Sequence, residues 1–168
     1  MAYQPNRLRT DGLSHRKPYA QATLDASSLA PGVSGRVRFY AAPGGTMVEA
    51  ALTGLPAMSQ PTATPQVGPF GFHIHEGTIC VDPTGSTPFA AAGGHYNPTN
   101  QPHPLHAGDL PVIFPNDGRG YMRMYTNRFT PADVVGRTVV LHQMPDDFRT
   151  QPAGDSGMRI GCGAIRRA

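Results

Sequence analysis

The chain has 168 residues, a length typical of one domain with a hydrophobic core. Its 20 glycines and 18 prolines, with only 15% charged residues, argue against long helices and favour a fold rich in turns. The net charge of +3 comes almost wholly from arginine, but no dense basic run with interleaved aromatics is present, so a nucleic-acid partner is not expected.

The strand signals are short and are separated by turns rich in glycine and proline. After a polar segment at 1–18, which we expect to be a flexible tail, a single domain at 19–168 carries all of them. The segment from Val33 to Ala42 alternates apolar residues with arginines, and a Pro-Gly-Gly turn returns it as a hairpin. In chain order, the expected strands cover residues 19–24, 33–42, 46–55, 70–75, 110–114, 120–125, 137–142 and 159–165.

Two long segments between these strands have no convincing regular element. They cover residues 76–108 and 145–157, while a Pro-rich loop occupies 57–69 and a brief helical turn is expected at 130–135. Loops without secondary structure that exceed about 15 residues are rare in compact domains unless they are functional or disordered. About eight strands with two long loops predict an all-β fold, either an antiparallel flattened sandwich or a barrel.

Three histidines have a spacing that suits a copper site. His73 and His75 are two residues apart on an expected strand, so both side chains point to the same face. His142, at the end of another expected strand, can approach that face from a neighbour. Clusters of imidazoles suit copper and zinc, although a His-x-His sequence alone is a weak signal. The one histidine outside the domain, His15, is expected to be solvated in the tail.

A second group of candidate ligands lies within one loop. His103, His106 and Asp109 lie within a segment of seven residues, so the loop can wrap them around one ion. Two or three histidines with a carboxylate are an ordinary zinc set. His95 lies between the two groups in the sequence and could serve either. The candidates are therefore enough for two adjoining metal sites that share one ligand.

The two cysteines do not by themselves settle the redox compartment. Cys80 and Cys162 lie far apart and outside any Cys-x-x-Cys motif, so spacing leaves open a disulfide or two buried free thiols. A disulfide would close a loop of about 80 residues and stabilise the fold by roughly 4 kcal/mol. No apolar stretch approaches the roughly 20 residues of a membrane helix, and no signal-peptide core is visible. We therefore expect no membrane span.

Five motifs follow one another along the chain. They are Gly71-Phe72-His73-Ile74-His75-Glu76, Gly94-His95-Tyr96-Asn97-Pro98, His106-Ala107-Gly108-Asp109-Leu110, Gly136-Arg137-Thr138-Val139-Val140-Leu141-His142 and Gly157-Met158-Arg159-Ile160-Gly161-Cys162-Gly163. In this order they resemble the motifs of copper/zinc superoxide dismutases. The resemblance extends over residues 19–165, and the Gly-Gly-His-Tyr sequence is closer to bacterial members of the family than to animal ones. It implies a Greek-key β-barrel.

The resemblance implies a role for each candidate ligand. His95 would be the shared imidazolate, with one ring nitrogen on each metal. Asp146 would hold N–H groups of both ligand sets and so fix their orientation. The implied copper ligands are His73, His75, His95 and His142, and the implied zinc ligands are His95, His103, His106 and Asp109.

The resemblance also implies a disulfide and an anion-binding residue. Cys80 and Cys162 match the intrachain disulfide of the family, which implies an extracytoplasmic location, meaning secreted, periplasmic or at the cell surface. Arg159 matches the active-site arginine, whose guanidinium is always charged and can hold a small anion such as superoxide. Family members are commonly dimers, which makes a homodimer a candidate assembly.

The implied activity is the disproportionation of superoxide to dioxygen and hydrogen peroxide, by Cu(II)/Cu(I) cycling with His95 as the bridging histidine. The alternative is a dismutase-like module that binds or carries zinc or copper without turnover. All four implied copper ligands are present, which favours the enzyme. The loop between His142 and Arg159 is short and lacks the lysine and glutamate pattern that guides substrate in eukaryotic relatives, so we expect a weaker or different dependence on salt.

Overall fold

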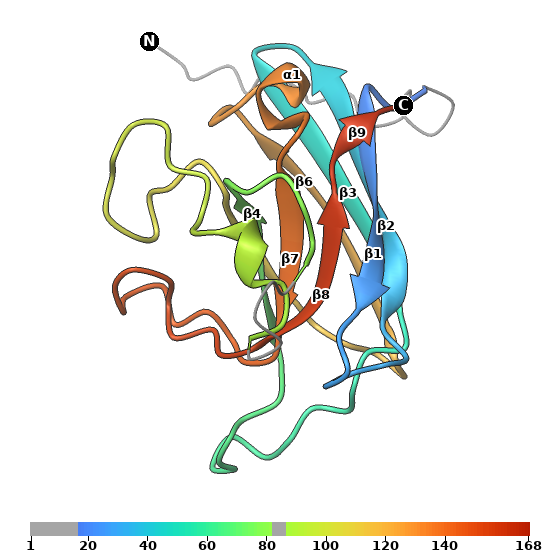
Figure 1. The fold of residues 1–168 in the computed structure, drawn as a ribbon, viewed down its shortest axis with the longest axis vertical. Coiled ribbons are helices and arrows are strands. Elements are labelled where there is room, and N and C mark those ends of the chain that lie inside the picture. The colour runs from blue at the N-terminus through green and yellow to red at the C-terminus, as the bar shows by residue number, and fades with distance from the viewer. Residues whose placement is uncertain (1–16, 82–86) are drawn as a thin grey trace, which may run out of the picture.

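The computed structural model describes residues 17–81 and 87–168, so nearly all of the tail expected at 1–18, including His15, lies outside the described residues. Strands dominate the described chain (Figure 1). Their bounds are β1 Ala20–Ala26, β2 Ser34–Ala42, β3 Gly45–Thr53, β4 Phe70–His75, β5 Asp109–Ile113, β6 Arg119–Thr126, β7 Thr138–His142, β8 Arg159–Ala164 and β9 Arg166–Arg167. Two short helical elements complete the fold, the 3-10 helix η1 (Ala90–Ala92) and the helix α1 (Pro131–Val134).

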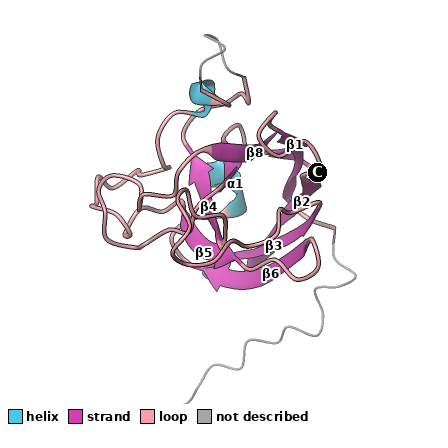
Figure 2. Ribbon diagram, turned by 90° about the horizontal axis from the view of Figure 1, so that it is seen from below, coloured by secondary structure: helices cyan, strands magenta, loops and turns pink. Residues whose placement is uncertain are grey.

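The strands form one antiparallel sheet that curls into a nearly closed barrel (Figures 1 and 2). Their order is β5-β4-β7-β8-β1-β2-β3-β6, and the short β9 pairs with β1. The chain passes from β3 to β4 and from β6 to β7, which are not neighbours in the sheet, as Greek-key connections do. The predicted fold class is confirmed.

Burial along the strands explains how the barrel positions the histidines. On β4, Phe70, Phe72 and Ile74 belong to the core inside the barrel, so the alternating His73 and His75 lie on its outer face. Every residue of β4 and β7 is nevertheless buried, because the described parts of the long loops, at 76–81, 87–108 and 143–158, cover that outer face. The two histidines therefore lie between the barrel wall and a layer of loops.

The structure differs from the expected elements at several strand ends and in one loop. β5 ends at Ile113, and Phe114 is 65% exposed, because Pro115 follows and has no N–H for a sheet hydrogen bond. The last strand is interrupted at Ile165, and β9 then pairs with the start of β1. The short η1 lies in the segment expected to lack regular structure, and three alanines carry no periodicity that would predict it.

The disulfide implied by the family resemblance is present. Cys80 and Cys162 are bonded, with their Cα atoms 5.7 Å apart, and the bond fixes the loop 76–108 to β8. The two cysteines pack with Phe89, Ala92 and Val140 in a small apolar cluster beside the loop. Among the described residues, no helix is long and apolar enough to cross a membrane.

Candidate metal centre

The first ligand group lies on the outer face of β4 and β7, beneath the two long loops. One ligand nitrogen from each of its four histidines lies within 4.8 Å of the others. The Nε2 atoms of His75 and His142 are 3.2 Å apart, although they come from strands 67 residues apart in the sequence. The structure thus brings together the four implied copper ligands His73, His75, His95 and His142.

The second group surrounds the carboxylate of Asp109 at the start of β5. Its oxygens lie 2.7 Å from Nδ1 of His95, 3.1 Å from Nδ1 of His103 and 3.3 Å from Nδ1 of His106. All four side chains are buried, and their ligand atoms also lie within 4.8 Å of one another. This group contains all four implied zinc ligands.

His95 belongs to both groups and faces them with different ring nitrogens. Its Nδ1 approaches Asp109, while its Nε2 is buried and has no hydrogen-bond partner among the described residues. The His95 ring lies close to that of His73, with centroids 4.0 Å apart, so Nε2 is on the side of the first group. A single imidazole with one nitrogen in each group has the geometry of a metal bridge.

The protonation states of the groups suit metal binding. Burial, followed by the charges of neighbouring histidines, holds the pKa values of His73 and His75 well below the ordinary 6.5, and burial lowers that of His142 to about 3. Burial raises the pKa of Asp109, but hydrogen bonding to His95 and the charges of the adjacent histidines outweigh it, so the net shift is downward. Metal ions bind neutral imidazole and ionised carboxylate.

Three buried nitrogens of the ligand histidines make no hydrogen bond within the described part of the chain, and a metal ion would satisfy them. They are Nδ1 of His73, Nε2 of His95 and Nδ1 of His103, the last of which lies 3.1 Å from the Asp109 carboxylate. Such orphaned polar atoms are rare in folded proteins and often mark an ion or a water molecule. The donor set of imidazoles in one group, and of imidazoles with a carboxylate in the other, fits copper and zinc.

Asp146 connects the two ligand groups by hydrogen bonds to one histidine of each. Its carboxylate accepts hydrogen bonds from Nε2 of His73 at 2.8 Å and from Nε2 of His103 at 2.9 Å, and it is fully buried. The backbone N–H of Phe148 also donates to it, at 2.7 Å. Because Nε2 of both rings is held in this way, Nδ1 of each is the nitrogen left for a metal.

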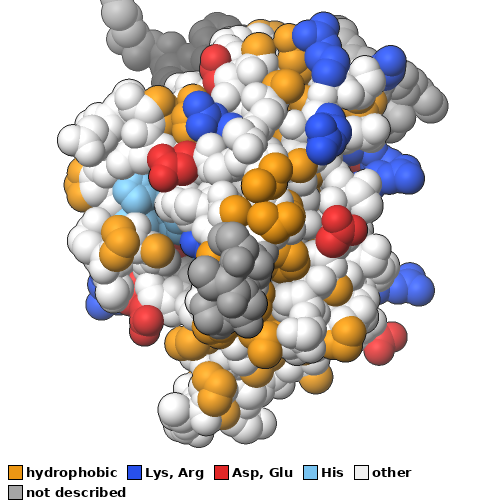
Figure 3. All heavy atoms as spheres, in the orientation of Figure 1, with side chains coloured by type: hydrophobic (Ala, Val, Ile, Leu, Met, Phe, Trp, Pro, Cys, Tyr) orange, Lys and Arg blue, Asp and Glu red, His pale blue; other side chains and the backbone are white. Residues whose placement is uncertain are grey.

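Arg159 lies at the start of β8, beside a hollow of about 740 Å³ that reaches the histidines. In Figure 3, parts of histidine side chains are visible from outside, at the left of the view. The guanidinium of Arg159 donates to the carbonyl oxygens of Phe89 and Gly93, each at 2.6 Å. Burial lowers the pKa of Arg159, yet a guanidinium keeps its charge at neutral pH.

Two backbone carbonyls hold ligand rings in a way that sequence analysis missed. The oxygen of Gly93, which accepts from Arg159, also lies 2.9 Å from Nδ1 of His75. The oxygen of Gly157 lies 3.3 Å from Nδ1 of His142. Both glycines have positive φ, at 71° for each, which favours glycine. Gly93-Gly94 and the glycine before Met158 were the visible signals, but residue spacing says nothing about where a carbonyl points.

The charges around the hollow agree with weak guidance of an anion. Among the described residues that line it, Arg159 is the one lysine or arginine, whereas Glu76 and Asp155 also line it. Two carboxylates therefore oppose one guanidinium around the hollow. The sequence analysis expected weak steering from another feature, the missing lysine and glutamate pattern in the loop between His142 and Arg159.

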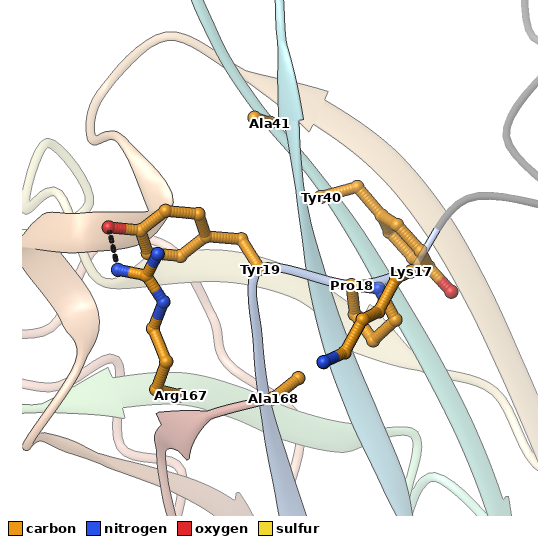
Figure 4. A pocket seen from close by; sticks show the side chains of 7 residues that line it. All are labelled: Lys17, Pro18, Tyr19, Tyr40, Ala41, Arg167 and Ala168. Atoms are coloured by element: carbon orange, nitrogen blue, oxygen red, sulfur yellow. Dashed lines mark hydrogen bonds between the residues drawn. The ribbon is translucent and has the colours of Figure 1, made fainter.

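A second hollow, of about 470 Å³, lies beside the C-terminus, away from the two long loops (Figure 4). The guanidinium of Arg167 lies 3.9 Å over the ring of Tyr19 and donates to its hydroxyl at 2.6 Å. Lys17 and Tyr40 complete its polar lining. None of the residues that line it belongs to the two ligand groups, so it plays no part in the metal centre.

Comparison with known proteins agrees with this geometry. The sequence model of copper/zinc superoxide dismutases matches residues 33–165. The chain belongs to the copper/zinc superoxide dismutase family. The superoxide dismutase [Cu-Zn] of Deinococcus radiodurans is 40% identical over 151 residues, which cover 80% of this chain and 78% of that protein. Superoxide dismutase [Cu-Zn] 2 of Aquifex aeolicus is 32% identical over 149 residues, 80% of each chain.

The fold of this dismutase family member is shared with a solved structure. The Cu/Zn superoxide dismutase from Brucella abortus aligns with a TM-score of 0.69 and 28% identity, over 86% of this chain and 98% of that chain. Family, bacterial type and enzyme class are thus as predicted from the motifs. The protein is an oxidoreductase that acts on superoxide, and its cofactors are copper and zinc.

Proposed function

We propose that this chain disproportionates superoxide at a copper ion bound by the first ligand group, beside a zinc ion bound by the second. The carrying observation is His95, whose Nδ1 lies against Asp109 while its buried Nε2 lies with the first group. Bound copper supplies one-electron chemistry by changing between Cu(II) and Cu(I), and bound zinc supplies a fixed positive charge. Overall, two superoxide ions and two protons give dioxygen and hydrogen peroxide.

Arg159 binds the anion in this proposal. Its guanidinium is half-buried beside the hollow and cannot swing away, because the carbonyls of Phe89 and Gly93 hold both terminal nitrogens. The Gly93 carbonyl also lies against the ring of His75, so the positive charge and the copper ligand keep a fixed relation. A charge that is already in place when the anion arrives costs no reorganisation.

His95 holds a proton in this proposal, and the other ligands keep their rings fixed. The second superoxide needs protons to leave as hydrogen peroxide. Nε2 of His95 is the nitrogen that can hold one of these protons between the two half-reactions, because Nδ1 of the same ring faces the carboxylate of Asp109. Asp146 restrains His73 and His103 through their Nε2 atoms. The carboxylate therefore keeps the ring orientations unchanged during turnover.

Replacement of one copper ligand tests the proposal. In His142→Ala, loaded with copper and zinc, we expect loss of copper and of superoxide dismutation, while zinc and the circular dichroism spectrum of the barrel remain. His15→Ala, which replaces the one histidine that matches no ligand of the family motifs, is the control and should retain copper and activity. Full dismutation by His142→Ala would overturn the assignment of the copper ligands.

We propose that the protein is a homodimer that pairs through an exposed apolar area on β6 and the turn before it. Phe114 and Tyr121 are 65% and 64% exposed and line one shallow hollow of about 550 Å³ with Ala51 and Leu52. Large apolar side chains that cluster on a surface commonly mark protein contacts. Sedimentation should give a dimer mass for the protein and a monomer mass for Phe114→Asp; a monomeric parent protein would contradict the pairing.

We propose that the protein acts outside the cytoplasm. The Cys80–Cys162 disulfide closes the chain segment between these two cysteines, which contains five of the seven metal-ligand residues. Such bonds persist in oxidising compartments. In cell fractions, the protein should be found outside the cytoplasm with both cysteines oxidised. A cytoplasmic pool with reduced cysteines would contradict this location.

A further inference from the structure

Gln151, in the loop 143–158, holds both peptide groups of His103 in the other long loop. The backbone N–H of His103 donates to Oε1 of Gln151 at 3.0 Å. Nε2 of Gln151 in turn donates to the carbonyl oxygen of His103 at 2.7 Å. The two residues are 48 positions apart, so one side-chain amide joins two separate loops through a donor and an acceptor.

His103 lies inside a turn closed by the N–H of Leu105, which donates to the carbonyl of Pro102 at 2.8 Å, but this bond does not use the peptide groups of His103 itself. His103 lies between Pro102 and Pro104, neither of which has an N–H to donate. Within the described chain, no backbone–backbone hydrogen bond involves the N–H or the carbonyl of His103. The segment around it has no helix or strand, so the bonds to Gln151 are what restrain the peptide groups of this ligand.

The loop that carries Gln151 is itself ordered by local contacts. The carboxylate of Asp147 accepts from the backbone N–H groups of Arg149 and Thr150, both at 2.8 Å. Gly154 then donates to the carbonyl of Thr150 at 2.7 Å. Gln151 therefore projects from a short, closed turn, and its amide can be in place before any metal binds.

The absence of a side chain at Gly154 lets this turn approach the metal centre. A Cβ atom there would overlap Oδ1 of Asp146 and would lie 2.8 Å from Nε2 of His103. The same loop thus contacts His103 at its ring through Asp146 and at its backbone through Gln151. Gln151 also lines the hollow that reaches the copper ligands. It therefore lies beside both the zinc ligand group and the opening to the copper ligand group.

We propose that Gln151 is a positioning residue for the zinc site, which fixes the backbone of His103 and thereby slows the release of zinc. The inference rests on the proposed function in one respect, that zinc binds the group containing His103. It assigns to Gln151 a part in metal retention that its exposed position on the surface loop would not suggest.

The test measures zinc release from the copper- and zinc-loaded protein to a chromogenic zinc chelator. Gln151→Ala removes both bonds, and we expect release faster by about 10- to 100-fold, the range typical of residues that support metal ligands. The matched control is Gln101→Ala, in the same loop as His103, because the Gln101 amide bonds only Thr99 within its own loop. It should release zinc at the parent rate.

Gln151→Glu separates positioning from folding. Its carboxylate can still accept from the N–H of His103 but cannot donate to the carbonyl, so its release rate should lie between those of the parent and Gln151→Ala. The absorption spectrum of Co(II) bound in place of zinc should change in Gln151→Ala and stay unchanged in Gln101→Ala.

Release of zinc from Gln151→Ala at the parent rate would overturn the inference, as would equal acceleration in Gln101→Ala. Failure of the zinc site itself has a different signature. If the His106→Ala variant retained zinc as the parent protein does, the proposed ligand group would be wrong, whatever the behaviour of Gln151.

Discussion

Asp146→Asn is the most informative single change, because it alters one atom at the point where both ligand groups meet. The carboxylate accepts from Nε2 of His73 and Nε2 of His103, at 2.8 and 2.9 Å, with no solvent access. The amide keeps one oxygen, so one of the two rings meets an N–H group and loses its acceptor. A hydrogen bond to a charged group contributes about 1.5–3 kcal/mol, and about 1.4 kcal/mol corresponds to a tenfold change in affinity. We therefore expect a loss of about 10- to 150-fold in the affinity for zinc or copper.

Competition against a chelator of known affinity, run separately for each metal, measures this loss. Asp117→Asn is the matched control, because Asp117 is exposed in the turn between β5 and β6 and belongs to neither ligand group. It should leave both affinities unchanged. Unchanged affinities for both metals in Asp146→Asn would refute the reasoning that this carboxylate orients the ligands.

Three further predictions concern stability, acid sensitivity and substrate approach. Cys80→Ser with Cys162→Ser opens a loop of 82 residues and should lower the free energy of unfolding by about 4.5 kcal/mol in urea titrations; a loss below about 1 kcal/mol would contradict it. For the metal-free protein, the folded pKa of His142 is about 3, so the unfolded chain takes up its proton first as the pH falls below about 6.5. Its stability should therefore be full above about pH 6.5 and fall with acid by up to about 1.4 kcal/mol per pH unit for each such histidine, and a flat profile in urea titrations would contradict this. Asp155→Asn removes a carboxylate beside the hollow and should raise kcat/KM for superoxide about twofold or more at low salt, with the gain lost at high salt; an unchanged rate would show that Asp155 does not oppose the substrate.

The barrel was largely predictable because its signals are local. The alternation on the segment 33–42 reflects one face in the core and one in solvent, and β2 and β3 form the expected hairpin there. β4 is buried on both faces, yet its period of two still placed His73 and His75 on one face. The Greek-key barrel and the full ligand sets came instead from the family resemblance, because spacing alone left open a sandwich or a barrel and did not assign His95.

The parts that could not be predicted depend on backbone groups and on contacts between loops. A carbonyl such as that of Gly93 has no sequence signature, so its double contact with Arg159 and His75 appears only in three dimensions. The bonds from Gln151 to His103 join loops 48 residues apart, and nothing in either loop's composition indicates the other. β9 is two residues long, too short to show a period.

Metal content, measured together with superoxide dismutation before and after the addition of copper, tests the central claim most directly. Two adjoining ligand groups that share His95 predict copper and zinc in roughly equal amounts in the loaded protein, with fast dismutation that depends on the copper. Zinc alone, with no dismutation even after copper addition, would contradict the account and indicate a metal-binding protein without turnover.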